Sequence, residues 1–232
     1  MRRRTRLIMI LLVTLSLAVS AVYSMLAGDA FYTRVYQHRS AMQPAGLPES
    51  EGELITHLPI ITLHTNDQEI PGERITGSED DIRQYTLSED GDTRIVVDFT
   101  MYSSGAANKL SDTPALSSRA RIRYRGNYSR WFYKKSYSVS LVMPDGISQN
   151  PRSLAGLPAH DEWVLHGPWI DRTLLRNYLA YNIAGEIMDY APNVRFVEMF
   201  LDDEYHGVYL LVEPVTRAQG RLDLIPNFQF YT

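Results

Sequence analysis

The sequence contains no cysteine and only three lysines. The absence of cysteine excludes disulfides and thiolate metal sites, although it does not assign a cellular compartment. The chain is mildly acidic, with a formal net charge of −4 at pH 7, which argues against general nucleic-acid binding. It also lacks a P-loop, a GxSxG elbow and a histidine pair at helical zinc spacing, so classical NTPase and hydrolase motifs are absent. What remains is a chain of 232 residues, enough for one large domain or two small ones.

The N-terminal segment combines a basic start with an apolar run. Four of its first six residues are arginines, and residues 7–27 then carry no charge. This is close to the length that an α-helix needs to cross a bilayer, with the arginines on the inside. Two interpretations are open: a cleaved signal peptide, or a retained membrane anchor, which the length of the run favours. In either case we expect the remainder to lie outside the cytoplasm, membrane-anchored or secreted.

The rest of the chain divides into a polar linker and one folded domain. Residues 28–53 are weakly patterned and polar, which is typical of a linker, whereas residues 54–232 carry the strand and helix patterns. Strands are predicted at residues 58–65, 94–102, 119–125, 136–141, 163–165, 195–201 and 207–213. The fold class that follows is α+β: an antiparallel sheet with one main packed helix, preceded by the N-terminal hydrophobic helix.

The strongest helix pattern covers residues 171–190. Asp171 is a credible N-cap, and Pro192 ends the helix. Leucine or isoleucine recurs every fourth residue, at Leu175, Leu179, Ile183 and Ile187. Such a row is typical of a helix face that packs on a sheet.

Positive charge is concentrated in a predicted strand pair at residues 119–141. On its first strand every second residue is an arginine, which places four guanidinium groups on one face: Arg119, Arg121, Arg123 and Arg125. Three further cations lie between the two strands: Arg130, Lys134 and Lys135. Donors of both kinds at fixed positions favour a phosphate site. The alternative is a solvated face of arginines paired with local carboxylates.

Two further clusters have both a functional and a structural interpretation. The segment 161–177 combines two tryptophans, His166 and a helix start followed by Arg176, and a helix N-terminus of this kind can hold an anion. Alternatively the tryptophans belong to the core and Asp171 only caps the helix. Residues 202–204 are all acidic and suggest a metal cluster, but such triplets more often form solvated turns.

Three sequence blocks, in order, resemble the CotH-like family of spore-coat protein kinases. RGNYSRWFYKKSYSVSL is similar to the family block RGNSSR-x-F-x-KKSY-x-I-x-L, and DEWVLHGPWIDRTLLRNYLAY to W-x-L-h-g-x-x-D-x-x-x-x-RN. VEMFLDDEYHGVYLLVEPV is similar to the third block, v-x-L-f-l-N-G-e-Y-x-G-v-Y-l-l-x-E. Together the resemblance covers roughly residues 58–224. The chain departs from the pattern at Tyr128, where the family has serine, and at Asp202-Asp203, where it has Asn-Gly.

The resemblance implies an atypical kinase-like fold that uses ATP with Mg²⁺ or Mn²⁺ to phosphorylate Ser or Thr. The expected partners are therefore a nucleotide and an exported protein substrate, with no nucleic acid. The positions that match the blocks, and that the resemblance assigns to nucleotide binding, are Arg125, Asn127, Arg130, Lys134, Lys135, Asp171, Arg176, Asn177 and Glu213. Family members continue into a second lobe that holds the metal and activates the hydroxyl. We expect this chain to represent the N-terminal lobe without the C-terminal one.

Three functional hypotheses follow. The first is an exported or membrane-tethered CotH-like kinase domain that binds ATP through the basic strand pair and is catalytically incomplete. The second is a non-enzymatic exported structural or binding module of the spore-coat or cell-surface type. The third is a metal-dependent exported hydrolase that uses Asp202, Asp203 and a histidine.

Overall fold

The computed structural model describes residues 3–26, 34, 36–40, 52–75, 85–104, 107–218 and 221–222. The chain divides into two units, residues 1–34 and residues 35–232, and each is described by itself. The predicted linker at residues 28–53 falls largely outside the described residues, as does the segment 223–232.

The first unit contains one helix, α1 (Arg3–Leu26), at the position of the predicted N-terminal helix. The side chains of residues 9–20 are exposed. Among the residues whose placement is described, no helix combines the length and the hydropathy that crossing a bilayer requires. Cleavage or retention of this segment stays a prediction.

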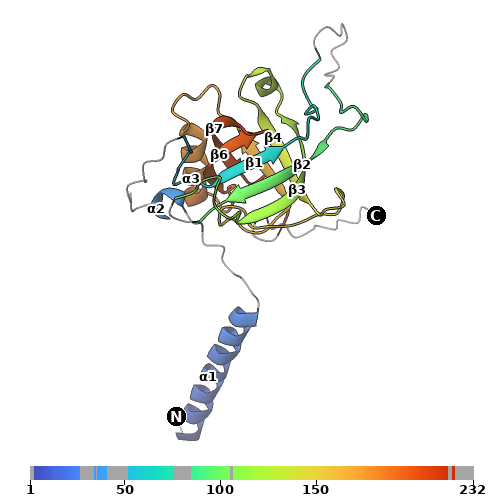
Figure 1. The fold of residues 1–232 in the computed structure, drawn as a ribbon. Coiled ribbons are helices and arrows are strands. Elements are labelled where there is room, and N and C mark those ends of the chain that lie inside the picture. The colour runs from blue at the N-terminus through green and yellow to red at the C-terminus, as the bar shows by residue number, and fades with distance from the viewer. Residues whose placement is uncertain are drawn as a thin grey trace. The chain divides into compact units, whose positions relative to one another are not determined.

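The second unit is a closed barrel of seven strands, and the colours of Figure 1 show the order of these strands along the chain. Its strands are β1 (Ile60–His64), β2 (Ile95–Tyr102), β3 (Leu116–Arg125), β4 (Ser136–Val142), β5 (Glu162–His166), β6 (Val194–Leu201) and β7 (Glu204–Val212). Its helices are α2 (Gln37–Ser40), α3 (Arg176–Ile187) and the 3₁₀ turn η1 (Tyr128–Trp131). The seven predicted strand segments all appear, with boundaries close to those expected.

The strand order around the barrel is β1-β2-β3-β4-β5-β7-β6, and β6 returns to β1. The closing pair is parallel, with Ile61 opposite Met199, whereas the other six pairs are antiparallel. The predicted fold class is therefore wrong: the sheet is closed and mixed, and it is not the open antiparallel sheet of a kinase-like N-terminal lobe. The physical reason is that inside–outside alternation looks the same in an open sheet and in a barrel. Nothing in the sequence of β1 reveals a second neighbour more than 130 residues away.

Alternating residues fill the barrel. On β2 every second side chain is buried, from Ile95 to Met101. The same alternation on β3 buries Ala120 and Ile122 and turns the arginines outward. The interior is one apolar cluster to which every strand contributes, with Phe99, Ile122 and Leu165 almost wholly buried.

Helix α3 lies outside the barrel against β6. Tyr178 stacks on Phe196 with 4.6 Å between ring centroids, in a small apolar cluster with Leu210. The helix begins five residues later than predicted, because Leu174 has a φ of 60°, a left-handed conformation that ends any helix preceding it. The row of Leu175, Leu179, Ile183 and Ile187, expected on the sheet, is instead exposed.

Candidate functional site

A cavity of about 180 Å³ lies on the outside of the barrel, between the ends of β3 and β5 and the helix α3. Its lining comes from five segments of the chain, and consists of Arg125, Val164, His166, Asn177, Tyr181, Pro192 and residues 212–215. Three of the nine residues predicted from the sequence therefore meet here: Arg125, Asn177 and Glu213.

His166 is the polar centre of this cavity. Register places Arg125 opposite Ser136 on β4, and the Ser136 hydroxyl lies 3.2 Å from Nδ1 of His166. The side-chain amide nitrogen of Asn177 lies 2.6 Å from Nε2 of the same ring. An amide N–H can only donate, so Nε2 accepts and Nδ1 carries the proton that is shared with Ser136. Burial, and then the charge of Arg125, hold the pKa of His166 below its ordinary value.

Glu213 also belongs to the lining of the cavity. Its side chain is buried, and Oε2 accepts two hydrogen bonds from Asn193, from the backbone N–H at 2.9 Å and the side-chain amide at 2.7 Å. Its other oxygen, Oε1, is buried with no hydrogen-bond partner among the described residues. An unsatisfied buried carboxylate oxygen is costly, so it indicates a place where a donor can bind; the charge of Glu213 already acts on Arg221, whose pKa it raises against the effect of burial.

Arg130 and Lys135 are held at one end of the barrel. Arg130 donates Nε to the carbonyl of Gly126 and Nη1 to that of Gly72, and its guanidinium lies 3.9 Å from the ring centroid of Tyr85. Lys135 donates to the carbonyl of Arg130 at 2.7 Å and pairs with Glu73 at 2.9 Å. Both cations therefore have partners within the chain and do not line the cavity.

Lys134 is held in a third place. Its ammonium donates to the carbonyl of His206 at 2.8 Å and lies 4.3 Å from the ring centroid of Tyr209, a fully buried tyrosine of β7. Burial lowers the pKa of Lys134, and the charge of Glu198 opposes that effect. The two neighbouring lysines thus point to different surroundings.

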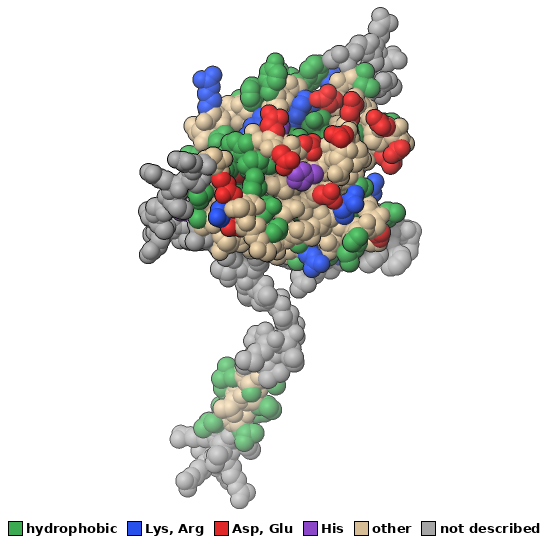
Figure 2. All heavy atoms as spheres, in the orientation of Figure 1, with side chains coloured by type: hydrophobic (Ala, Val, Ile, Leu, Met, Phe, Trp, Pro, Cys, Tyr) green, Lys and Arg blue, Asp and Glu red, His purple; other side chains and the backbone are tan. Residues whose placement is uncertain are grey.

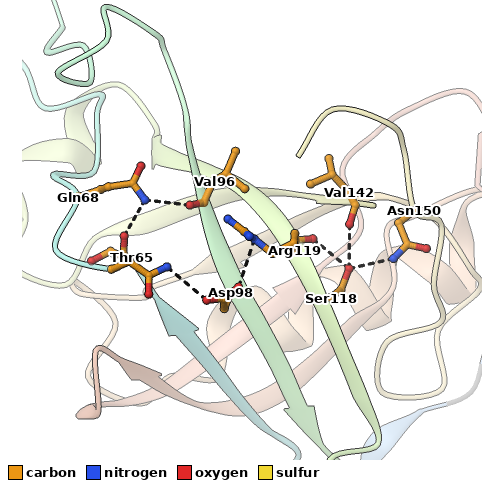
Figure 3. A network of polar contacts seen from close by, with 9 residues as sticks. Thr65, Gln68, Val96, Asp98, Ser118, Arg119, Val142 and Asn150 are labelled. Carbon is orange, nitrogen blue, oxygen red and sulfur yellow. Dashed lines mark hydrogen bonds and ion pairs between the residues drawn. The ribbon is translucent and has the colours of Figure 1, made fainter. Parts of the chain in front are cut away.

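The outward arginines of β3 do not form a shared site with the lysines. Arg119 pairs with Asp98 at 3.2 Å, in the network of polar contacts that Figure 3 shows between β2 and β3. Of the four arginines in the row, Arg125 alone lines the cavity. On the face drawn in Figure 2, acidic side chains gather over one region and basic ones are scattered around it. This face carries no continuous basic patch.

The remaining predicted residues lie outside the cavity. Asp171 accepts hydrogen bonds from Thr173 and from the backbone N–H of Arg176, and the Thr173 hydroxyl is the first cause of its lowered pKa. The Arg176 guanidinium is exposed and lies 3.6 Å from the Asp171 carboxylate. Asn127 is exposed beside η1 and makes no capping hydrogen bond from its side chain.

The acidic triplet forms a turn. Asp202 and Asp203 both have positive φ, of 48° and 66°, between β6 and β7. The Asp202 carboxylate accepts from the backbone N–H and the hydroxyl of Thr65, at 2.7 and 2.8 Å. Over the described residues, no group of three or more His, Asp or Glu side chains is placed to hold a metal ion. The metal cluster that the hydrolase hypothesis requires is therefore not found among the described residues.

Sequence reasoning did not select His166, Ser136 or Asn193 as site residues. His166 carries a visible signal, because it ends a strand with the parity opposite to the buried Trp163 and so faces outward. Asn193 carries none, since its role depends on the closing of β6 against β7, which brings it to Glu213.

Comparison with known proteins matches residues 122–221 to the family described as CotH kinase protein. Inner spore coat protein H of Bacillus subtilis (strain 168) is 31% identical over 94 residues. That alignment covers 40% of this chain and 23% of the relative, so the chain spans about a quarter of the relative's length. The residues matched by the family include Arg125, His166, Asn177 and Glu213 of the cavity.

Proposed function

The chain resembles CotH kinase proteins over residues 122–221, and from this premise we propose that the cavity of Arg125, His166, Asn177 and Glu213 binds the phosphate end of ATP together with a divalent ion. The observation that carries the proposal is the meeting of three predicted residues in the lining of one cavity. One of them, Glu213, has a buried carboxylate oxygen with no hydrogen-bond partner among the described residues. The chain would act as an exported module. The basic strand pair would contribute Arg125 to the cavity.

The residues of the cavity fit both parts of such a ligand. The Arg125 guanidinium supplies a planar, permanently charged donor for phosphate oxygens. Asn177 approaches His166 through its amide nitrogen, and this contact fixes the orientation of the ring. Mg²⁺ and Mn²⁺ prefer oxygen ligands, and Mg²⁺ commonly takes one carboxylate together with substrate phosphates. Glu213 is the acidic residue of the lining.

The volume limits what the cavity accepts. Pockets that enclose a whole small molecule usually measure at least about 300 Å³. A cavity of about 180 Å³ accommodates phosphate groups and an ion, with the nucleoside lying outside it. Specificity for the base is therefore not expected from these residues. Transfer of the phosphoryl group to Ser or Thr of an exported protein would also require a positioned base and further charge neutralisation.

The test is a titration of the folded chain with ATP in the presence of Mg²⁺ or Mn²⁺, followed by calorimetry. We expect binding that EDTA weakens and that Arg125→Ala weakens by about tenfold or more, the loss of one charge-assisted contact. The matched control is Arg121→Ala, because Arg121 shares the outward face of β3 but does not line the cavity. Absence of binding by a chain whose circular dichroism shows an intact fold would overturn the proposal.

A second function is favoured by a different observation. Arg130, Lys134 and Lys135, which the family resemblance assigned to phosphates, all make contacts within the barrel. In a non-enzymatic exported structural or binding module, of the spore-coat type that the relative's name suggests, these cations would make contacts within the chain and would not bind phosphate. It predicts no nucleotide binding and no transfer of radiolabelled phosphate to protein, whereas the first function predicts at least the binding.

A further inference from the structure

The outward arginines of β3 divide into members with a partner and members without one. Arg119 forms an ion pair with Asp98 of β2 (Figure 3), and Arg125 lines the cavity. Arg121 and Arg123, which lie between them, make neither a hydrogen bond nor an ion pair with any described residue. The Nε atom of Arg123 is even buried without an acceptor. A buried donor without a partner is rare in folded proteins and calls for an explanation.

A third cation joins these two from the neighbouring strand. Arg94, directly before β2, donates from Nη1 to the hydroxyl of Ser140 on β4, at 2.5 Å. Because β3 lies between β2 and β4, the Arg94 side chain crosses β3 to reach that hydroxyl. Arg121 is the residue of β3 that pairs with Ser140, and Arg123 pairs with Ser138. The three arginines therefore share one region of the outer surface of the barrel.

The charges in this region do not balance. The pKa of Arg94 is lowered first by burial and then by the positive charge of Arg123, and Arg121 acts in the same direction. Glu162, which lies opposite Ser140 on β5, opposes that effect. One carboxylate beside three guanidinium groups leaves an excess of positive charge. Like charges held together destabilise a folded chain, and an anion bound among them would remove that cost.

We propose that Arg94, Arg121 and Arg123 form a binding site for a tetrahedral oxyanion, a phosphate or sulfate group. Guanidinium groups present planar, permanently charged pairs of donors that fit such oxygens. Successive outward residues of one strand are about 6.6 Å apart, and neighbouring strands about 4.8 Å, so three long side chains from β3 and the start of β2 can converge on one group. The half-buried Ser138, opposite Arg123, adds a hydroxyl donor.

This site is separate from the cavity of the proposed function. None of its three arginines lines that cavity, and its donors need no divalent ion to bind an oxyanion. Two or three charge-assisted contacts on an outer surface should hold a single phosphate with a dissociation constant on the order of millimolar. The chemistry is the same for a free anion and for a group carried on a polymer, and the experiment separates the two sources.

The first experiment is a titration of the folded chain with inorganic phosphate at constant ionic strength, with sodium chloride as the balancing salt. By NMR, the Nε–H signals of Arg121 and Arg123 should shift and saturate. Arg121→Met and Arg123→Met, which keep an apolar stem, should each weaken binding by about fivefold or more, the loss of one charge-assisted contact. Arg119→Met is the matched control and should change it less than about twofold, because Arg119 already has Asp98 as its partner.

The same titration keeps this site distinct from the ATP site. EDTA and Arg125→Ala should leave phosphate binding unchanged, whereas both should weaken the binding of ATP with its divalent ion. Arg121→Met should have the converse effect, with the EDTA-sensitive part of ATP binding retained. Polyphosphate is the second probe: an affinity per phosphate at least about tenfold above that of inorganic phosphate identifies a group carried on a polymer, and an equal affinity identifies the free anion.

The second experiment measures stability in urea. Without phosphate, Arg121→Met should unfold at the same urea concentration as the wild type or at a higher one, because the substitution relieves repulsion. Phosphate should raise the midpoint of the wild type and of Arg119→Met, since a ligand stabilises the state that binds it, and should leave Arg121→Met unchanged. Shifts that do not saturate, an equal effect of chloride, or equal losses in Arg119→Met and Arg121→Met would overturn the proposal.

Discussion

Asn177 approaches Nε2 of His166 to 2.6 Å and so joins the first turn of α3 to the end of β5. The contact has consequences for both elements. It determines which nitrogen of the imidazole carries the proton, and it holds the start of the helix over the cavity that Arg125 and Glu213 also line. The predictions that follow are derived from a His166 whose pKa is lowered beside the cation Arg125, and from the buried carboxylate of Glu213.

The pKa of His166 should respond to Arg125. Burial is the larger cause of its lowered pKa and Arg125 the second. Followed by NMR, Arg125→Ala should raise the pKa of the imidazole, but not to the ordinary value of about 6.5, because burial persists. Arg121→Ala should leave it unchanged. A pKa that does not move in Arg125→Ala would show that the two groups do not interact.

The stability of the barrel should fall on acidification through His166. Since its folded pKa is lowered, the unfolded chain binds more protons at acidic pH than the folded chain does. The stability that the neutral ring contributes is complete above about pH 6.5 and is lost as the pH falls towards the folded pKa. Free energies of unfolding in urea at a series of pH values should show this loss.

His166→Asn should reduce the pH dependence without removing it. The pKa of His160 is also lowered, first by burial and then by the charge of Arg221, so His160 contributes in the same direction. A pH dependence identical in the wild-type chain and in His166→Asn would contradict the assignment.

Substitutions of Glu213 should distinguish its contribution to the stability of the fold from its contribution to ligand binding. In Glu213→Ala, the buried Asn193 loses the one oxygen, Oε2, that accepts from both its backbone and its side-chain N–H groups, which should cost about 2 kcal/mol or more. Glu213→Gln keeps one oxygen to accept from Asn193, so its stability should lie within about 1 kcal/mol of the wild type. It should nevertheless lose the Mg²⁺-dependent part of ATP binding, because an amide replaces the carboxylate.

Urea unfolding and calorimetry measure the two effects of Glu213 in the same variants. Asn193→Ala is the matched comparison, since it removes the partner and keeps the carboxylate. If Glu213→Gln bound Mg²⁺-ATP as the wild type does, Oε1 would not be the position of the ion.

The strands were predictable, but their closure was not. The alternation on β2 and β3 is a local property, and it located both strands and the outward arginines. The parallel pairing of β1 with β6 joins residues such as Ile61 and Met199, and a single sequence contains no signal for so distant a contact. The α+β prediction failed at that point.

The candidate site was predicted in part for a similar reason. The resemblance of the three sequence blocks to the family selected Arg125, Asn177 and Glu213, which the fold brings together. It also selected Lys134 and Lys135, which are adjacent in the sequence but lie in different surroundings. Their partners, the carbonyl of His206 and the carboxylate of Glu73, belong to segments whose placement depends on the closed barrel.

The apolar row of α3 illustrates the limit of periodicity. An i, i+4 row shows that a helix has an apolar face, but it does not show which neighbour covers that face. Here the aromatic Tyr178, one residue away from Leu179 on the adjacent face, is the residue that packs on the barrel.

The close packing around Gly167 provides a final test, of the path by which the chain leaves β5. A Cβ at this position would lie 2.6 Å from the carbonyl oxygen of Lys135, a backbone atom that cannot move aside without disturbing the start of β4. Gly167→Ala should therefore destabilise the barrel by about 1–3 kcal/mol through overpacking. It should also displace the hydrogen bond from the Gly167 N–H to Ser136, and with it the ring of His166. Gly156→Ala is the control, because its Cβ would meet nothing within 4 Å and only its positive φ of 75° is unfavourable. Urea unfolding should be measured for both variants, with the NMR resonances of His166 as a second measurement. Destabilisation of Gly156→Ala alone would contradict this packing.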